Sequence, residues 1–108
     1  MTWIDYLAHF FGGAFLFNAL PHLTAGLMGR PFQTPFAKPP GQGLSSSRVN
    51  IVWGFANLVV AWLLLTRVGD FDLREPIDAL VFGAGGLLIG FYLAGRFGRF
   101  NGGNAPEA

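Results

Sequence analysis

The chain has 108 residues, of which 52% are hydrophobic and only 12% are charged, and its formal net charge is +1. A soluble domain carries about 25% charged residues, so this composition excludes an ordinary soluble protein and indicates one membrane domain over residues 1–108. The near-neutral charge, with no basic patch, excludes nucleic-acid binding, and the absence of cysteine excludes disulfides, iron–sulfur clusters and thiolate zinc sites.

The first apolar run covers residues 7–28 and contains no charged side chain. Its length is about what a helix needs to cross a bilayer. The residues before it include Asp5 and no Lys or Arg, so we expect the run to remain in the mature protein rather than act as a signal peptide. Asn18, Pro21 and His22 lie in its second half, and a polar group in hydrocarbon requires a partner. The other helices are therefore expected to be arranged around this one.

Residues 30–48 are rich in proline and glycine, which predicts a loop with extended segments. The Pro-Phe pair occurs twice, at Pro31-Phe32 and Pro35-Phe36. We expect this Pro/Phe-rich loop to lie at the membrane interface, with its rings toward the hydrocarbon and its cations toward anionic lipid. A proline-rich docking motif for a partner protein is the alternative. The cations assigned to lipid headgroups are Arg30, Lys38, Arg48, Arg96 and Arg99.

The second apolar run covers residues 49–68 and follows three serines, which are favourable helix N-caps. Asn50 and Asn57 lie two turns apart on one helix face, with Trp53 between them. These three residues, together with Asn18 and His22, are the candidates for lining a ligand site or a path through the membrane.

The third apolar run covers residues 76–95 and begins with a proline at the first helical position. Small residues recur along one face of this helix and predict a stripe where another helix packs closely. The stripe consists of Ala79, Gly83, Gly86, Gly90 and Ala94. The tail over residues 101–108 is rich in Gly, Asn and Pro, and we expect it to be disordered.

These runs predict an all-α polytopic membrane protein with three transmembrane helices. The loop at 30–48 and the C-terminal tail carry five of the seven Lys and Arg residues, whereas the opposite side has only Arg67 and Arg74. Cations concentrate on the cytoplasmic side of membrane proteins. The sequence therefore predicts a multi-pass protein of the inner (plasma) membrane, with its N-terminus outside and its C-terminus in the cytoplasm.

Depth along each helix can be counted at about 1.5 Å per residue from the centre of its span. This count places Asn18 and Asn57 in one layer near the midplane, together with Gly86. His22 and Trp53 fall one turn nearer the cytoplasm. Because Pro21 cannot donate a backbone hydrogen bond to residue 17, we expect Asn57 to donate to that carbonyl and to pair with Asn18. We likewise expect the Trp53 indole N–H to donate to His22.

The sequence contains no nucleotide-binding loop, nucleophile elbow or metalloprotease motif, which favours a non-enzymatic protein without a cofactor. His9 and His22 would lie about 20 Å apart along one helix and cannot bind one haem iron. Two histidines without a carboxylate cluster do not form a metal site. We expect a structural or accessory subunit of a larger membrane complex, or a homo-oligomer. The alternatives are a small oligomeric transporter or channel with Asn18, His22 and Asn57 along its path, and a binder of an apolar cofactor such as a quinone or carotenoid.

Overall fold

The computed structural model of the protein describes residues 1–105 and is mostly helical, as predicted. Its elements, in chain order, are α1 (Trp3–Leu27), β1 (Phe32–Gln33), β2 (Leu44–Ser45), α2 (Ser47–Thr66) and α3 (Pro76–Asn101). All three helices are long and apolar enough to cross a membrane. Their lengths and composition are therefore compatible with a multi-pass membrane protein.

The helix ends differ from the predicted boundaries because local capping, rather than hydrophobicity, decides where each helix begins and ends. α1 starts at Trp3 instead of residue 7, and Asp5 accepts a hydrogen bond of 3.0 Å from the Thr2 backbone N–H. α2 starts at Ser47, because Ser46 caps it by accepting from the Val49 N–H. α3 continues beyond residue 95 to Asn101, and Gly102 ends it in a left-handed conformation with φ of 85°.

The tail therefore begins in the last turn of α3 rather than as a separate segment. Asn104 donates from its side chain to the Gly95 carbonyl at 2.8 Å, so the described part of the tail turns back onto the helix. Residues 106–108, where the rest of the predicted disordered tail falls, lie outside the described residues.

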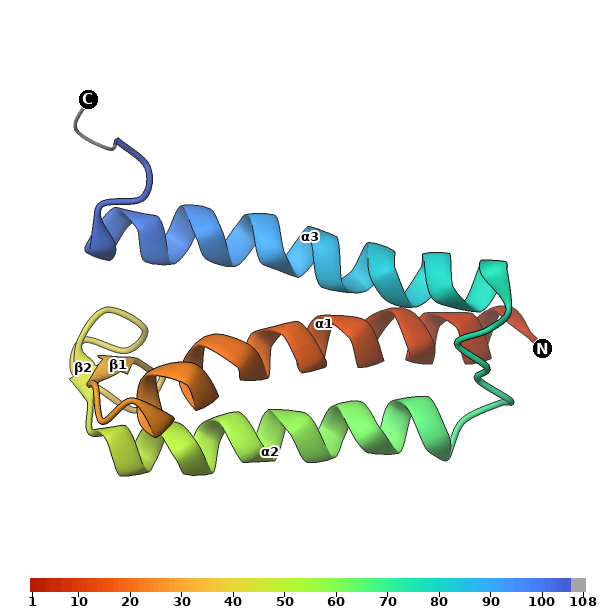
Figure 1. Cartoon of the computed structure of the whole chain (residues 1–108), viewed down its shortest axis with the longest axis horizontal. Helices are drawn as coiled ribbons and strands as arrows, with labels where there is room; N and C mark the ends of the chain where they lie inside the picture. Colours follow the sequence, from red (N-terminus) through yellow and green to blue (C-terminus); the bar gives the residue numbers. More distant parts are fainter. Residues whose placement is uncertain (106–108) are drawn as a thin grey trace.

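α1 lies between the other two helices and contacts both, whereas α2 and α3 make few direct contacts with each other (Figure 1). A hairpin of residues 30–46 connects α1 to α2, and its strands pair with Phe32 opposite Ser45 and Gln33 opposite Leu44. Figure 1 shows this hairpin beside the C-terminal end of α3; we call this the hairpin end of the bundle. The N-terminus and the α2–α3 connection lie at the opposite end.

The contact between α1 and α3 depends on glycines, but not on the complete stripe predicted from the sequence. Gly86 packs against the Phe17 ring, whereas a Cβ built on Gly83 or Gly90 would meet no neighbouring element within 4 Å in the described chain. The closest backbone approach is made instead by Gly85 and Gly13. A Cβ built on Gly85 would lie 1.8 Å from the Phe10 carbonyl oxygen, so only glycine allows the helices to pack at this distance.

The distribution of buried side chains is the reverse of that in a soluble protein. The buried apolar residues of the described chain are all alanines, namely Ala19, Ala25 and Ala61. The buried polar residues are His9, His22, Gln33, Thr34, Asn50, Asn57 and Asp78. Large apolar side chains face outward instead; Val52, Leu80 and Phe91 are each 71% exposed. Such a surface suits hydrocarbon as the solvent, with polar groups paired with one another inside the bundle. Among residues 1–105, the buried side-chain atom without a hydrogen-bond partner is His9 Nδ1.

Candidate functional site

Asn50 is the centre of a buried polar network at the hairpin end. It lies in the first turns of α2 and is completely buried. Its side-chain Nδ2 donates to the carbonyls of Phe32 and Ser45, at 3.2 Å each, and to that of Ser46 at 3.0 Å. Its Oδ1 is 2.8 Å from His22 Nδ1. One amide therefore joins both strands of the hairpin to α2 and α1.

The contacts of Asn50 also determine which nitrogen of His22 carries a proton. Because Asn50 donates through Nδ2 to carbonyl oxygens, its Oδ1 must be the acceptor, and the His22 Nδ1–H must donate to it. In the neutral imidazole, Nε2 is then an acceptor. Three aromatic rings contact His22 edge to face, at centroid distances between 5.6 and 6.3 Å. They belong to Phe32, Trp53 and Phe97.

The structure assigns His22 a different hydrogen-bond partner from the one expected. The expected donor was the Trp53 indole, but Trp53 contacts His22 only ring to ring, and Asn50 is the hydrogen-bond partner. Depth counting cannot separate the two, because it does not say how each helix is rotated about its axis.

A second polar pair lies deeper in the bundle. Asn18 Nδ2 donates to Asn57 Oδ1 at 2.9 Å, so the structure brings these two amides together across the α1–α2 interface. Asn57 does not donate to the Phe17 carbonyl, contrary to expectation. Its Nδ2 donates to the Trp53 carbonyl of its own helix, at 2.9 Å. The geometry of the side chain favours this local acceptor at position i−4.

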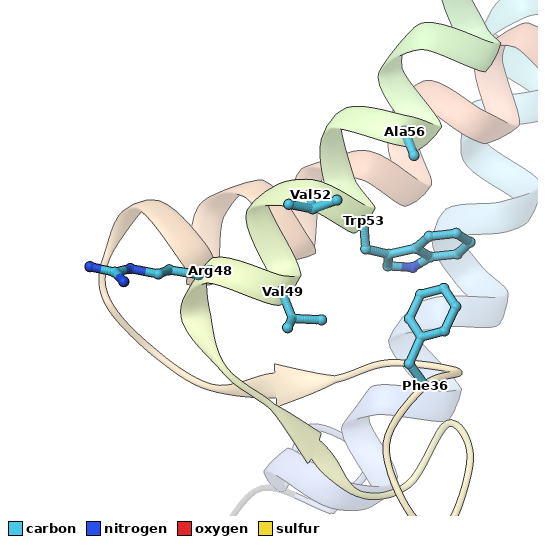
Figure 2. Close-up of a pocket in the computed structure, with 6 residues that line it drawn as sticks. All are labelled: Phe36, Arg48, Val49, Val52, Trp53 and Ala56. Atoms are coloured by element: carbon cyan, nitrogen blue, oxygen red, sulfur yellow. The ribbon is translucent and has the colours of Figure 1, made fainter.

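The two phenylalanines of the repeated Pro-Phe pairs hold the hairpin against the helices. Phe32 packs against Phe97 of α3, with ring centroids 4.7 Å apart. Phe36 packs against Trp53 of α2 at 5.0 Å. Figure 2 shows the Phe36 ring facing the Trp53 indole, whereas the Arg48 side chain points away from both. This pair borders an open apolar groove of about 530 Å³ on the outer face of α2.

Sequence reasoning did not identify Gln33 and Thr34, although the hairpin buries both side chains. Thr34 hydrogen-bonds to the Ser45 hydroxyl and accepts from the Phe36 N–H at 3.2 Å. Gln33 Oε1 accepts from Asn101 of α3 at 3.4 Å. Two polar residues within a proline-rich loop carry no signal of burial, because their environment depends on how the loop folds back.

Side chains from all parts of the fold meet around a small cavity between the helices and the hairpin, with a volume of about 150 Å³. The polar and aromatic residues around it are Asn18, His22, Gln33, Thr34, Trp53, Tyr92, Arg96 and Phe97. We call this the hairpin cavity. Of the predicted site residues, Asn18, His22 and Trp53 line it. Asn50 and Asn57 do not line it, but they hydrogen-bond to His22 and Asn18, respectively.

Arg96 differs from the other cations assigned to lipid headgroups. Its Nη2 donates to the Gly41 carbonyl at 3.2 Å, so it joins α3 to the hairpin as well as lining the cavity. The remaining four cations are exposed; they are Arg30, Lys38, Arg48 and Arg99. All five belong to the hairpin end, whereas every acidic residue among residues 1–105 lies at the opposite end.

The opposite end contains a separate buried imidazole. His9 is fully buried, and its Nε2 donates to the carbonyl of Val68, just beyond the last turn of α2. Val68 lies beyond the C-cap of α2, where its carbonyl has no helical partner, so this contact satisfies a group that hydrocarbon could not. The Phe71 ring covers His9 edge to face at 5.1 Å. His9 thus links the first half of α1 to the segment that follows α2.

No protein-family model, curated protein or solved structure matches this chain. Within residues 1–105, no group of three or more His, Asp or Glu side chains is placed to hold a metal ion.

Proposed function

We propose that this chain is a non-enzymatic, multi-pass protein of the inner (plasma) membrane that acts as an accessory subunit or as a homo-oligomer. The observation that carries the proposal is the combination of inverted burial with unequal charge at the two ends. Polar side chains meet inside the bundle, and large apolar ones cover its outside. Hydrocarbon favours this arrangement, and water opposes it.

Charge supports the proposed orientation. The hairpin end carries five cations, whereas Arg67 and Arg74 at the opposite end are outnumbered by five carboxylates. These carboxylates belong to Asp5, Asp70, Asp72, Glu75 and Asp78. The positive-inside rule places the hairpin end at the cytoplasmic leaflet and the N-terminus outside. Arg30, Lys38 and Arg48 then lie near anionic headgroups.

The contacts favour a structural role over transport. A path lined by Asn18, His22 and Asn57 would need their polar groups to face a water-filled channel. Instead, Asn18 bonds to Asn57, and His22 bonds to Asn50. These bonds use the polar groups to join helices, which is their commonest role in membrane bundles.

The orientation can be tested with single cysteines, because the native chain contains none. Leu73 in the α2–α3 connection and Gln42 in the hairpin are both exposed. In intact cells, we expect a membrane-impermeant thiol reagent to label Leu73→Cys, and to label Gln42→Cys only after permeabilisation. Labelling of Gln42→Cys in intact cells, with Leu73→Cys labelled only after permeabilisation, would contradict the orientation. Recovery of both variants in a carbonate-soluble fraction, with equal labelling, would contradict membrane embedding.

The assembly can be tested at the open groove that Gly90 of α3 lines together with Phe17 and Phe32. Gly90 faces no atom within 4 Å in the described chain, so a cysteine there should be accessible to a neighbouring helix. After oxidation of membranes containing Gly90→Cys, we expect either a disulfide-linked dimer or a cross-link to another membrane protein by a bifunctional thiol reagent. The first result would indicate a homo-oligomer and the second a larger complex. A chain that remains monomeric at native expression, also when the cysteine is moved to Gly83 or Ala94, would contradict both.

A further inference from the structure

Two hydrogen-bond acceptors at the hairpin cavity remain unused by the protein. Asn18 donates its Nδ2 to Asn57, which leaves its Oδ1 without a partner among residues 1–105. His22 donates through Nδ1 to Asn50, which leaves Nε2 as an acceptor in the neutral ring. Both side chains line the cavity. A molecule bound there could therefore satisfy them by donating hydrogen bonds, as hydroxyl groups do.

Arg96 and Gln33 supply hydrogen-bond donors to the same cavity. Arg96 uses one Nη2 contact for the Gly41 carbonyl, and a guanidinium has five N–H groups in total. Gln33 accepts from Asn101 through Oε1, which leaves its Nε2 amide for another acceptor. No acidic side chain lines the cavity within the described chain. The site thus offers an uncompensated positive charge and an amide donor, which suit a phosphate group.

The cavity continues into an apolar groove between α1 and α3. The groove has a volume of about 300 Å³ and shares Asn18, Tyr92 and Leu93 with the cavity. Its other lining residues are Phe11, Ala14, Phe15 and Ile89. The polar cavity lies at the hairpin end and the groove extends from it toward the middle of the bundle. A ligand that fits both parts has a small polar head and an apolar chain.

We propose that the hairpin cavity binds the headgroup of one anionic phospholipid that carries free hydroxyls, of the phosphatidylglycerol type. Its phosphate contacts Arg96 and Gln33, its hydroxyls donate to His22 Nε2 and Asn18 Oδ1, and one acyl chain lies in the α1–α3 groove. The inference rests on the membrane embedding proposed above. An oxidised quinone fits less well, because its carbonyls accept hydrogen bonds but donate none, and they would leave His22 and Asn18 unsatisfied.

The headgroup can be tested with short-chain lipids added to the delipidated full-length protein in mild detergent. The probes are dioctanoyl phosphatidylglycerol, phosphatidic acid and phosphatidylcholine, and the readouts are native mass spectrometry and the shift in melting temperature. We expect one phosphatidylglycerol to bind and raise the melting temperature. Phosphatidic acid lacks the hydroxyls and should bind more weakly, and zwitterionic phosphatidylcholine more weakly still. Equal binding of all three, or preferential retention of a quinone from native membranes, would overturn the proposal.

Arg96→Gln and Arg99→Gln form a matched pair for testing the site. Both guanidinium groups lie over the Phe100 ring, at 5.4 and 5.7 Å, but only Arg96 lines the cavity. A charge-assisted hydrogen bond contributes about 1.5–3 kcal/mol, so Arg96→Gln should weaken phosphatidylglycerol binding by about tenfold or more. Arg99→Gln should leave it nearly unchanged. If both variants lost phosphatidylglycerol binding equally, the lipid would respond only to general surface charge, and the proposed site would be wrong.

A third variant keeps the test decisive if Arg96→Gln loosens the hairpin. Ala14 lines the groove but not the cavity, so Ala14→Phe fills the space assigned to the acyl chain and leaves the polar groups unchanged. We expect it to reduce binding of dioctanoyl phosphatidylglycerol severalfold while the circular dichroism spectrum stays native. Unchanged lipid binding by a folded Ala14→Phe protein would overturn the placement of the acyl chain in the groove. Neither result affects the orientation tested by cysteine labelling, so the two proposals fail separately.

Discussion

Replacing Asn50 by leucine is expected to lower the free energy of unfolding by about 3 kcal/mol or more, because several buried groups lose their partner together. His22 Nδ1 would have no acceptor, and the carbonyls of Phe32 and Ser45 would lose a donor. Each buried polar group left unsatisfied costs about 1–3 kcal/mol. The measurement is unfolding of the purified protein in mild detergent, followed by circular dichroism against temperature or denaturing detergent.

Asn57→Leu is the matched control, because it makes the same change on the same buried face of α2. Asn57 joins α1 only through Asn18, and its other bond is to the Trp53 carbonyl within its own helix. Interhelical hydrogen bonds of this kind contribute about 0.5–2 kcal/mol, so we expect a smaller loss of stability. A loss as large as that of Asn50→Leu would show that the two amides act equally, and the central role assigned to Asn50 would be wrong.

Gly85→Ala is expected to separate α1 from α3 and to destabilise the protein by about 1–3 kcal/mol through overpacking. The added Cβ would lie 1.8 Å from the Phe10 carbonyl oxygen and 3.2 Å from the Ala14 nitrogen. These are backbone atoms, which cannot move aside as a flexible side chain can. The same unfolding measurement applies, and a disulfide or fluorescence distance between the helices would report their separation.

Gly83→Ala is the control for this change, on the same helix and close in sequence. A Cβ at Gly83 meets nothing within 4 Å of the described chain. Alanine also favours the helix by about 1 kcal/mol relative to glycine, so we expect unchanged or slightly higher stability. If Gly83→Ala destabilised the protein as much as Gly85→Ala, the close approach at Gly85 would not be the cause, and an outer partner at Gly83 would be.

Much of the candidate site could be predicted, because polar residues within apolar runs are conspicuous. Asn18, His22, Asn50, Trp53 and Asn57 were all named from the sequence, and counting depth along the helices placed Asn18 beside Asn57, where the structure joins them. Which group hydrogen-bonds to His22 could not be predicted. Asn50 and Trp53 are both close enough in depth, and only the rotation of α2 decides between them.

The other residues that line the hairpin cavity could not be predicted from the sequence. Nothing in the sequence distinguishes Gln33 and Thr34 from ordinary loop residues. They are buried because Phe32 and Phe36 hold the hairpin against the bundle. The place of Arg96 at the end of an apolar run predicts contact with lipid headgroups. The continuation of α3 beyond residue 95 instead turns it toward Gly41 and the cavity.

The sequence by itself determined that there are three apolar helices, roughly where each lies in the chain, and which end of the bundle is positive. These properties depend on hydrophobic length and charge, which are local and additive along the chain. The tertiary structure alone decided that Gly85 rather than Gly83 meets α1, and that Asn50 rather than Trp53 holds His22. Asn50 and Trp53 point about 60° apart around α2, and Gly83 and Gly85 about 160° apart around α3, so the rotation of each helix about its axis decides which residue reaches a partner. No local pattern specifies that rotation.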